Sequence, residues 1–231
     1  MLRKLEQWFF PFVCGLCSEF SDRQQDLCQR CFDSLPWIVD RCYHCGEDLL
    51  LSESSISCKR CETNPFSFDR LCALFSYEPP IRQLISRLKF SSNLSDGRIL
   101  AELLKEKISV WYKEQPLPEA LIPMPLHIKR LRKRGFNQAL ELVLPIHKHH
   151  QIPILIDACV RIKNTRPQAE LGEIERKQNM ENAFKVVKPF AFEHVAIIDD
   201  VVTTGSTVHA LSKVLKQTGV DRIDIWCIGR A

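Results

Sequence analysis

Four Cys-x-x-Cys pairs lie near the start of this chain, and they constrain its fold more than any other feature of the sequence. The pairs are Cys14 and Cys17, Cys28 and Cys31, Cys42 and Cys45, and Cys58 and Cys61. The spacing lets both sulfurs of a pair reach one ion, and eight thiolates make two tetrahedral sets of the soft ligands that Zn²⁺ prefers. Because cysteine fills every position, we expect two structural zinc ions. Sequential pairing is the simplest arrangement, and a cross-braced pairing stays open.

Disulfides and an iron-sulfur cluster are the alternatives for these thiols. The chain has 11 cysteines, an odd total, and its first residues lack the pattern of a secretory signal peptide. No apolar run approaches the roughly 20 residues of a membrane span. We therefore expect a cytoplasmic protein with reduced thiols and no membrane insertion, and the paired spacing favours zinc over iron and sulfur. His44 is not expected to be a ligand, and Cys72, Cys159 and Cys227 are expected in the core.

The composition changes after the last cysteine pair. Residues 62–65 predict a loop, so we place a double zinc-ribbon module at residues 1–65 and a second domain at 66–231. Expected helices are Ile81–Leu88, Ile99–Trp111, Gln138–His150, with a kink or break at Pro145, and Thr207–Thr218. Expected strands are Ala120–Met124, Ile154–Cys159, Val195–Ile198 and Arg222–Ile228. The alternation predicts an α/β fold, a mostly parallel sheet flanked by helices, with ligands at the carboxyl ends of its strands.

One strand of this sheet leads into a segment rich in polar groups. The apolar run Val195–Ile198 is followed by the acid pair Asp199 and Asp200, and a helix begins near Thr207. Gly205 lets the backbone between them approach a ligand, and free N–H groups at a helix start favour an anion. A phosphate beside two carboxylates implies a ligand with hydroxyls or a metal, as in a phosphorylated ribose. An ordinary strand-turn-helix, capped by Thr204 or Ser206 with solvated aspartates, is the plainer alternative.

A basic run, Lys129–Arg134, places five cations in six residues, although the formal net charge of the chain is only +4. Such density needs an anionic neighbour or open solvent. The run could clamp pyrophosphate, contact a nucleic-acid backbone with Phe136 stacked on a base, or form a solvated helix face. Three further cations and three histidines are expected on exposed helix surfaces: Arg82, Arg87, Lys89, His147, His149 and His150.

The segment Val195–Thr207 resembles the fingerprint with which type I phosphoribosyltransferases bind 5-phosphoribosyl-1-pyrophosphate (PRPP). The wider chain is similar to the ComF family of competence proteins, which includes GntX-like proteins. The residues that carry this resemblance are Leu88–Phe90, Ile122–Leu126, Arg134–Gln138, Thr165 and Gln168, Arg176 and Asn179, and Ala183–Phe184.

The resemblance implies a phosphoribosyltransferase core that binds PRPP together with Mg²⁺. It implies that Asp199 and Asp200 engage the ribose hydroxyls directly or through the metal's water, as the catalytic pair. The 5-phosphate would be held by Val201, Val202, Thr203, Thr204, Gly205, Ser206 and Thr207. The pyrophosphate loop and its basic neighbours would be Pro123, Met124, Pro125, Arg130, Arg132, Lys133, Arg134, Asn137 and Gln138. A hood at about residues 163–180 would close over the site with Thr165, Gln168, Arg176 and Asn179.

Three functions are compatible with these features. The ComF resemblance implies a factor of natural transformation that helps to internalise single-stranded DNA in the cytoplasm, with DNA-uptake or recombination proteins as partners. The core could instead be an active phosphoribosyltransferase, in which an unknown acceptor attacks C1 of PRPP and expels pyrophosphate. It could also be a sensor that binds PRPP without turnover.

Overall fold

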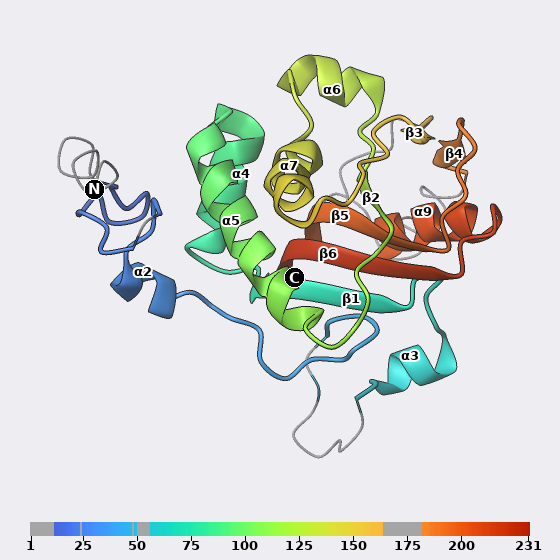
Figure 1. Ribbon diagram of the computed structural model, residues 1–231, viewed down its shortest axis with the longest axis horizontal. Coiled ribbons are helices and arrows are strands. Elements are labelled where there is room, and N and C mark those ends of the chain that lie inside the picture. Colours follow the sequence, from blue (N-terminus) through green and yellow to red (C-terminus); the bar gives the residue numbers. More distant parts are fainter. Residues whose placement is uncertain (1–11, 24, 48, 50–55, 164–181) are drawn as a thin grey trace.

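A four-stranded parallel sheet forms the centre of the molecule (Figure 1). The computed structural model describes residues 12–23, 25–47, 49, 56–163 and 182–231. The sheet has the order β1-β6-β5-β2, and its strands are β1 (Arg70–Ser76), β6 (Arg222–Arg230), β5 (His194–Val202) and β2 (Ala120–Pro123). All three neighbouring pairs are parallel. The mostly parallel sheet expected from the sequence is confirmed.

The two faces of the sheet pack against different helices. Ala196 and Ile198 of β5 belong to a core shared with α4 (Ile81–Ser91), α5 (Leu94–Trp111) and α7 (Gln138–His150). Val195 and Ile197, which point the other way, belong to a second core with α9 (Ser206–Lys216). Figure 1 shows α4, α5 and α7 together on one side of the sheet. Because both faces are covered, β5 is apolar at successive positions rather than at alternate ones.

Two strands differ from the sequence-based expectation. The strand expected at Ile154–Cys159 is wrong, because Ile154 makes only an isolated bridge to Leu121 and the exposed Ile156 lies in a bend. A short strand, β3 (Cys159–Arg161), begins where the expected one ended, and it pairs antiparallel with β4 (Phe184–Val186) in a separate two-stranded sheet. β1 was not expected, yet it forms one edge of the main sheet.

The helices follow the expected pattern with small differences. Pro145 lies inside α7, which continues to His150 without a break. His147 and His150 are half-buried, and Nδ1 of His147 lies 2.7 Å from the carbonyl oxygen of Ile152, so only His149 fits the expectation of an exposed histidine. The chain reverses after α7 through Gln151, which brings Ile152 back against the helix end. In the described part of the chain, no helix combines the length and the apolar character needed to cross a bilayer.

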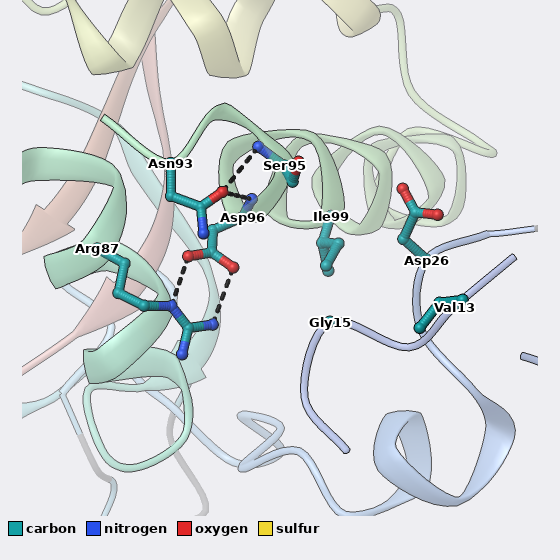
Figure 2. A pocket seen from close by; sticks show the side chains of 8 residues that line it. All are labelled: Val13, Gly15, Asp26, Arg87, Asn93, Ser95, Asp96 and Ile99. Atoms are coloured by element: carbon teal, nitrogen blue, oxygen red, sulfur yellow. Dashed lines mark hydrogen bonds and ion pairs between the residues drawn. The ribbon is translucent and has the colours of Figure 1, made fainter. Parts of the chain in front are cut away.

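Each cysteine cluster includes the start of a short helix. Cys28 precedes α2 (Gln29–Asp33) and Cys58 precedes α3 (Lys59–Thr63). The first cluster packs against α5, where a Cβ added to Gly15 would lie 2.7 Å from Cδ1 of Ile99. Gly15 and Ile99 lie next to each other in the lining of a cavity of about 460 Å³ (Figure 2). This contact brings the first ribbon onto the helical face of the sheet, away from α9.

The junction of α4 and α5 is fixed by polar contacts in the same region (Figure 2). Asn93 caps α5 by accepting from the backbone N–H groups of Ser95 and Asp96. Arg87 was expected to be exposed, but it donates two hydrogen bonds, of 2.7 and 2.9 Å, to the buried carboxylate of Asp96. The physical reason is that Asp96, on the inner side of the first turn of α5, needs a charged donor once it leaves water.

Candidate binding site and zinc centres

The acid pair lies inside β5 rather than after it. The strand continues through Asp199 and Asp200 to Val202, and the two residues are only 8% and 3% exposed. The alternative in which these aspartates are solvated is therefore wrong. The Asp199 carboxylate accepts a hydrogen bond of 2.9 Å from the backbone N–H of Asp200. Two adjacent carboxylates are thus buried near the carboxyl end of a central parallel strand, which is the edge where α/β proteins bind ligands.

Lys89 and Gln138 bring two helices onto this acid pair. The Nζ atom of Lys89, on α4, forms an ion pair with Oδ2 of Asp200. Gln138, the first residue of α7, also hydrogen-bonds to Asp200, and its amide oxygen accepts from the guanidinium of Arg134. The expectation that Lys89 belongs to an exposed helix face is wrong, because the side chain turns inward and is 21% exposed. Its signal in the sequence was the Leu88–Phe90 motif.

The two carboxylates have opposite pKa shifts. Burial raises the pKa of Asp199 well above the usual range, and the neighbouring charge of Asp200 raises it further. Burial also acts to raise the pKa of Asp200, but the ammonium of Lys89 outweighs it and the net pKa is lowered. Asp224, at the other end of the sheet, is equally buried yet receives hydrogen bonds from Tyr112, His194 and Arg222, and its pKa is lowered. A buried acid whose pKa is raised by desolvation and by a neighbouring charge, as at Asp199, is typical of a functional site.

The segment that follows β2 lies beside the acid pair. The backbone N–H of Met124 donates to the carbonyl of Ile198 at 2.8 Å, just before Asp199. The side-chain amide of Asn137 donates to the carbonyl of Met124 at 3.1 Å, and its oxygen caps α7. Pro123, Met124 and Pro125 are all buried. The residues expected to form a pyrophosphate loop are therefore held next to the acid pair by β5 and α7.

The basic run forms α6 (Ile128–Arg134) and divides into two faces. Arg130 and Arg134, one helical turn apart, are half-buried, whereas Arg132 and Lys133 are exposed. Burial lowers the pKa of Arg130 and of Arg134, and the carboxylates of Asp199 and Asp200 partly offset this at Arg134. Burial and the neighbouring Arg130 also lower the pKa of Arg161, on β3, to about 10. The inner face of α6 therefore adds cations to the acid pair, a combination suited to an anionic ligand that carries a metal.

The turn between β5 and α9 is built around Gly205. This residue has φ of 79° and occupies the N-cap position of α9, where no side chain caps the helix. The hydroxyls of Thr204 and Ser206 lie 2.7 Å apart and hydrogen-bond to each other. In the plainer alternative Thr204 or Ser206 was the N-cap; that position belongs to Gly205, although the Thr204 hydroxyl also accepts from the backbone N–H of Ser206 at 3.4 Å. Phe66 covers Gly205, since a Cβ added to the glycine would lie 3.1 Å from the phenyl ring.

A pocket of about 480 Å³ opens beside this turn. Thr204 and Ser206 line it from the turn, Lys213 from α9, Gln217 from the residue after α9, and Arg60 from the second ribbon. Its described lining contains no carboxylate. The calculated volume lies within the usual range for small-molecule sites, so the turn adjoins a space that can accept an anionic group.

The eight cysteines form two separate clusters. Cys14, Cys17, Cys28 and Cys31 make one, and Cys42, Cys45, Cys58 and Cys61 make the other, with the sulfurs of each cluster within 4.8 Å of one another. Two of the distances, Cys17 to Cys28 and Cys45 to Cys58, are 3.7 and 3.6 Å between sulfurs. A tetrahedron with Zn–S bonds of about 2.3 Å has edges of roughly 3.8 Å. Both clusters thus fit a structural zinc ion, and the pairing is sequential.

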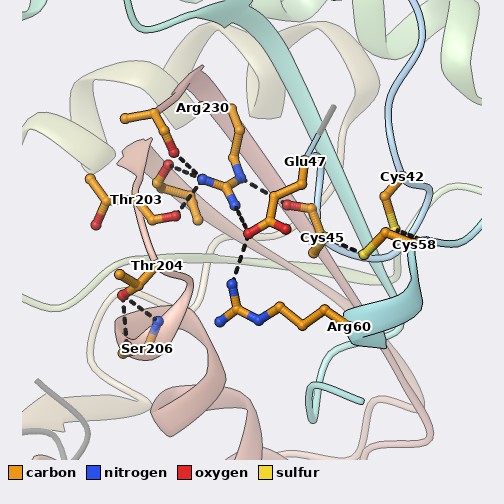
Figure 3. Close-up of polar contacts among 12 residues, drawn as sticks. Cys42, Cys45, Glu47, Cys58, Arg60, Thr203, Thr204, Ser206 and Arg230 are labelled. Carbon is orange, nitrogen blue, oxygen red and sulfur yellow. Dashed lines mark hydrogen bonds and ion pairs between the residues drawn. The ribbon is translucent and has the colours of Figure 1, made fainter. Parts of the chain in front are cut away.

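The remaining residues are placed as follows. His44 uses Nδ1 for a contact of 2.9 Å with the carbonyl of Asp69, outside the cysteine cluster. Cys72, Cys159 and Cys227 are buried in the core. The four hood residues lie outside the described part of the chain: Thr165, Gln168, Arg176 and Asn179. Sequence reasoning missed Phe66, which contacts the turn from the linker after the second ribbon. It also missed Arg230, which contacts the turn from the end of β6 (Figure 3).

Comparisons with known proteins agree on the N-terminal module and on the family. A family model described as a double zinc ribbon domain matches residues 5–62. The chain is 35% identical to competence protein F of Haemophilus influenzae, over 96% of this chain and 99% of that protein. It is 32% identical to DNA utilization protein YhgH of Salmonella typhi, over 95% of this chain and 97% of that protein.

Two further matches are more distant. Competence protein ComFC of Streptococcus pneumoniae is 24% identical and matches 68% of this chain and 67% of its own length. A purine phosphoribosyltransferase from Pyrococcus horikoshii shares 17% identity over 59% of this chain and 83% of that chain, at a TM-score of 0.32, which is too low to support an argument. The identity to competence protein F and to YhgH extends over nearly the whole of each protein. The chain therefore belongs to the family of competence protein F and the DNA utilization proteins YhgH.

Proposed function

We propose that this protein binds PRPP together with Mg²⁺ at the segment from Asp199 to Thr207. The observation that carries the proposal is the convergence of a buried acid pair, the inner arginines of α6 and an uncapped helix start at the end of one strand. The carboxylates suit ribose hydroxyls and a hard divalent cation, which prefers oxygen ligands. The cations and the helix start suit phosphate groups.

The chain's own residues have separate tasks in this proposal. Asp199 and Asp200 hold the ribose and the metal's water, and the turn around Gly205 holds the 5-phosphate through backbone N–H groups. Arg130 and Arg134 face the pyrophosphate. Mg²⁺ supplies charge neutralisation between the acid pair and the phosphates. Lys89 pairs with Asp200, and its ammonium would add a further cation beside the phosphates of a ligand held at the acid pair.

We further propose that the protein uses this domain in the cytoplasm to help internalise single-stranded DNA during natural transformation, together with DNA-uptake or recombination proteins. The names of its relatives concern competence and DNA utilization, which supports this role. The outer face of α6 offers Arg132 and Lys133 for a nucleic-acid backbone. Close to it, Phe90 is 79% exposed and the guanidinium of Arg134 lies 5.9 Å from its ring centre, an arrangement on which a base can stack.

Isothermal titration with PRPP, with and without Mg²⁺, tests the binding proposal. We expect Asp199→Asn and Asp200→Asn each to abolish Mg²⁺-dependent binding, because each replaces a carboxylate that can ionise toward the metal with a neutral amide that cannot. Asp157→Asn is the matched control, since Asp157 is an exposed carboxylate paired with Lys188. Unchanged affinity in both site variants would overturn the proposal.

The same samples distinguish a binding protein from an enzyme. Release of pyrophosphate from PRPP in the presence of an acceptor would add phosphoribosyl transfer to the proposed function. Binding without pyrophosphate release for any nucleobase or amine offered would favour the sensor. The buried acid pair is compatible with either outcome, because transfer at C1 depends on positioning and charge stabilisation.

A further inference from the structure

Arg230, the last residue of β6, connects the second zinc cluster to the phosphate turn (Figure 3). Its side chain is 4% exposed. On the ribbon side, Nε donates to the carbonyl oxygen of Cys45 at 2.8 Å, and Nη2 pairs with Oε1 of Glu47 at 3.1 Å. On the other side, Nη1 donates to the carbonyl oxygen of Thr203. One guanidinium thus binds a zinc-ligating residue and the first residue of the turn.

A second set of contacts joins the same two elements. Glu47 also accepts from Nη1 of Arg60 at 2.8 Å, so its carboxylate is shared between Arg230 and the helix that follows Cys58. The guanidinium of Arg60 lies 5.3 Å from the ring centre of Phe66, and that ring covers Gly205. The second ribbon therefore reaches the turn both through the buried guanidinium of Arg230 and through an aromatic ring.

Through these contacts, the position of the turn depends on whether the second ribbon is folded. A guanidinium has five donors in a rigid fork, so its partners must keep a fixed geometry to satisfy it once it is buried. The Cys45 carbonyl keeps its position only while the loop around it is held, and a zinc ribbon of this size depends on its metal for folding. Loss of zinc from the second cluster would displace the ribbon-side partners of Arg230, the Cys45 carbonyl and Glu47. The buried guanidinium would then lack part of its hydrogen bonds beside Thr203.

We propose that Arg230 is a positioning residue that couples the second zinc centre to the phosphate-binding turn. Zinc held by Cys42, Cys45, Cys58 and Cys61 then strengthens binding of a ribose phosphate, although no cysteine touches the ligand. Because coupling between two binding sites is reciprocal, the ligand must raise the affinity of the second centre for zinc and so lower the fraction of that centre without zinc in the presence of a chelator. The ligand effect rests on the proposed function, whereas the mechanical link between ribbon and turn does not.

Cysteine alkylation read by mass spectrometry tests this coupling in the full-length protein. The zinc-loaded protein is treated with a zinc chelator and an alkylating reagent, with and without ribose 5-phosphate, a probe that lacks the metal-binding pyrophosphate. We expect the probe to slow alkylation of Cys58 and Cys61 about fivefold or more, the lower end of typical coupling. Cys28 and Cys31 of the first ribbon serve as the internal control, and their alkylation should not change. Equal protection of both ribbons would overturn the proposal.

Two substitutions separate the coupling from general stability. Arg230→Gln should remove the protection of Cys58 and Cys61 by the probe. Arg41→Gln should retain it, because Arg41 also binds the second ribbon, at the carbonyl of Gly46, but reaches Ser76 on β1 rather than the turn. Protection that persists in Arg230→Gln overturns the proposal.

Amide hydrogen exchange keeps the coupling testable if the protein does not bind the probe. In that case the proposed function fails, but Arg230→Gln should still speed exchange of the amides of residues 203–206 with both zinc ions bound. Arg41→Gln should leave their exchange at the rate of the unmodified protein. No difference between the two variants would overturn the link between ribbon and turn.

Discussion

Lys89 on α4 forms an ion pair with Asp200 on β5, next to the carboxylate of Asp199. Asp200 raises the pKa of Lys89 against the opposing effect of burial, and Lys89 lowers that of Asp200. Only one of the two buried carboxylates has this cation. Asp199 keeps a raised pKa, so ionising both carboxylates together is unfavourable unless a further cation, such as a divalent metal, binds beside them.

Lys89→Met should destabilise the protein, and more strongly as the pH rises. Burial acts to raise the pKa of Asp200, and Lys89 holds it low. Without Lys89 the pKa of the buried Asp200 rises above its value in the unfolded chain, so the variant loses stability as the pH rises above the ordinary carboxyl pKa. Removing one partner of a buried ion pair costs about 3 to 5 kcal/mol. Urea unfolding at pH 4.5 and at pH 8 measures the difference, which should be larger at pH 8.

Two further variants check the cause of this loss. Lys188→Met removes the cation of an exposed pair with Asp157 and should have little effect at either pH. Adding Asp200→Asn to Lys89→Met should restore much of the stability, because no unpaired carboxylate is left in the core. Failure of this rescue would show that Lys89 stabilises the protein by packing rather than by charge.

Asp199→Asn should stabilise the protein without ligand at neutral pH. The pKa of Asp199 is raised in the folded state, so between the ordinary carboxyl pKa and the folded value the folded protein holds a proton that the unfolded chain has lost. Stability therefore falls as the pH rises through this window, and asparagine removes that dependence. We expect a gain of about 0.5 to 2 kcal/mol at pH 8 and little at pH 4.

Thermal unfolding between pH 4 and pH 8 provides the measurement. Asp157→Asn is again the control and should show no such gain, because Lys188 lowers the pKa of Asp157. A loss of stability in Asp199→Asn at pH 8 would contradict the prediction. The expected combination of higher stability with lost Mg²⁺ binding is the trade-off typical of a site built for a ligand.

Gly205→Ala should cost more stability than Gly219→Ala, although both glycines have positive φ, of 79° and 94°. An alanine in this region costs roughly 1 to 2 kcal/mol. At Gly219 nothing lies within 4 Å of an added Cβ, whereas at Gly205 the ring of Phe66 lies at 3.1 Å and must shift. We expect about 1 kcal/mol more for Gly205→Ala in urea unfolding. Equal losses of stability in the two variants would mean that the Phe66 ring moves aside at no energetic cost.

Much of the fold could be predicted from sequence because its signals are local. The buried run before Asp199 predicts a central strand, and the spacing of Ile81, Leu84, Ile85 and Leu88 predicts the buried face of α4, where all four are buried. Edge elements were harder to predict. Residues 154–159 are as apolar as many strands. However, only Ile154 and its neighbours pair with the edge strand β2, through an isolated bridge to Leu121.

Only the part of the site that lies in one contiguous segment could be predicted from the sequence. Asp199 to Thr207 carries its own pattern, whereas the partners of that segment come from distant parts of the chain. A lysine on an amphipathic helix is usually solvated, and only the folded position of α4 turns Lys89 toward a buried acid. In the same way, nothing local marks Arg230 as the partner of Cys45 and Thr203, because that contact depends on where the second ribbon packs.

The two faces of α6 should separate the two anionic ligands of the proposed function. Replacing the inner pair, Arg130 and Arg134, by glutamine should weaken PRPP binding at least tenfold, because each charge-assisted hydrogen bond contributes about 1.5 to 3 kcal/mol. Replacing the outer pair, Arg132 and Lys133, should leave PRPP binding unchanged and weaken binding of single-stranded DNA.

The salt dependence of DNA binding makes this separation quantitative. For single strands, each phosphate contact contributes a slope of about −0.7 in a plot of log affinity against log salt concentration, so losing two contacts should reduce the slope by roughly 1.4. Fluorescence anisotropy with a labelled oligonucleotide at several salt concentrations measures it. Lys105→Gln, on α5 and paired with Glu102, is the control for lost charge elsewhere. If the outer pair alters neither slope nor affinity while the inner pair alters both, DNA and PRPP compete for one surface, and the assignment of DNA to the outer face of α6 is wrong.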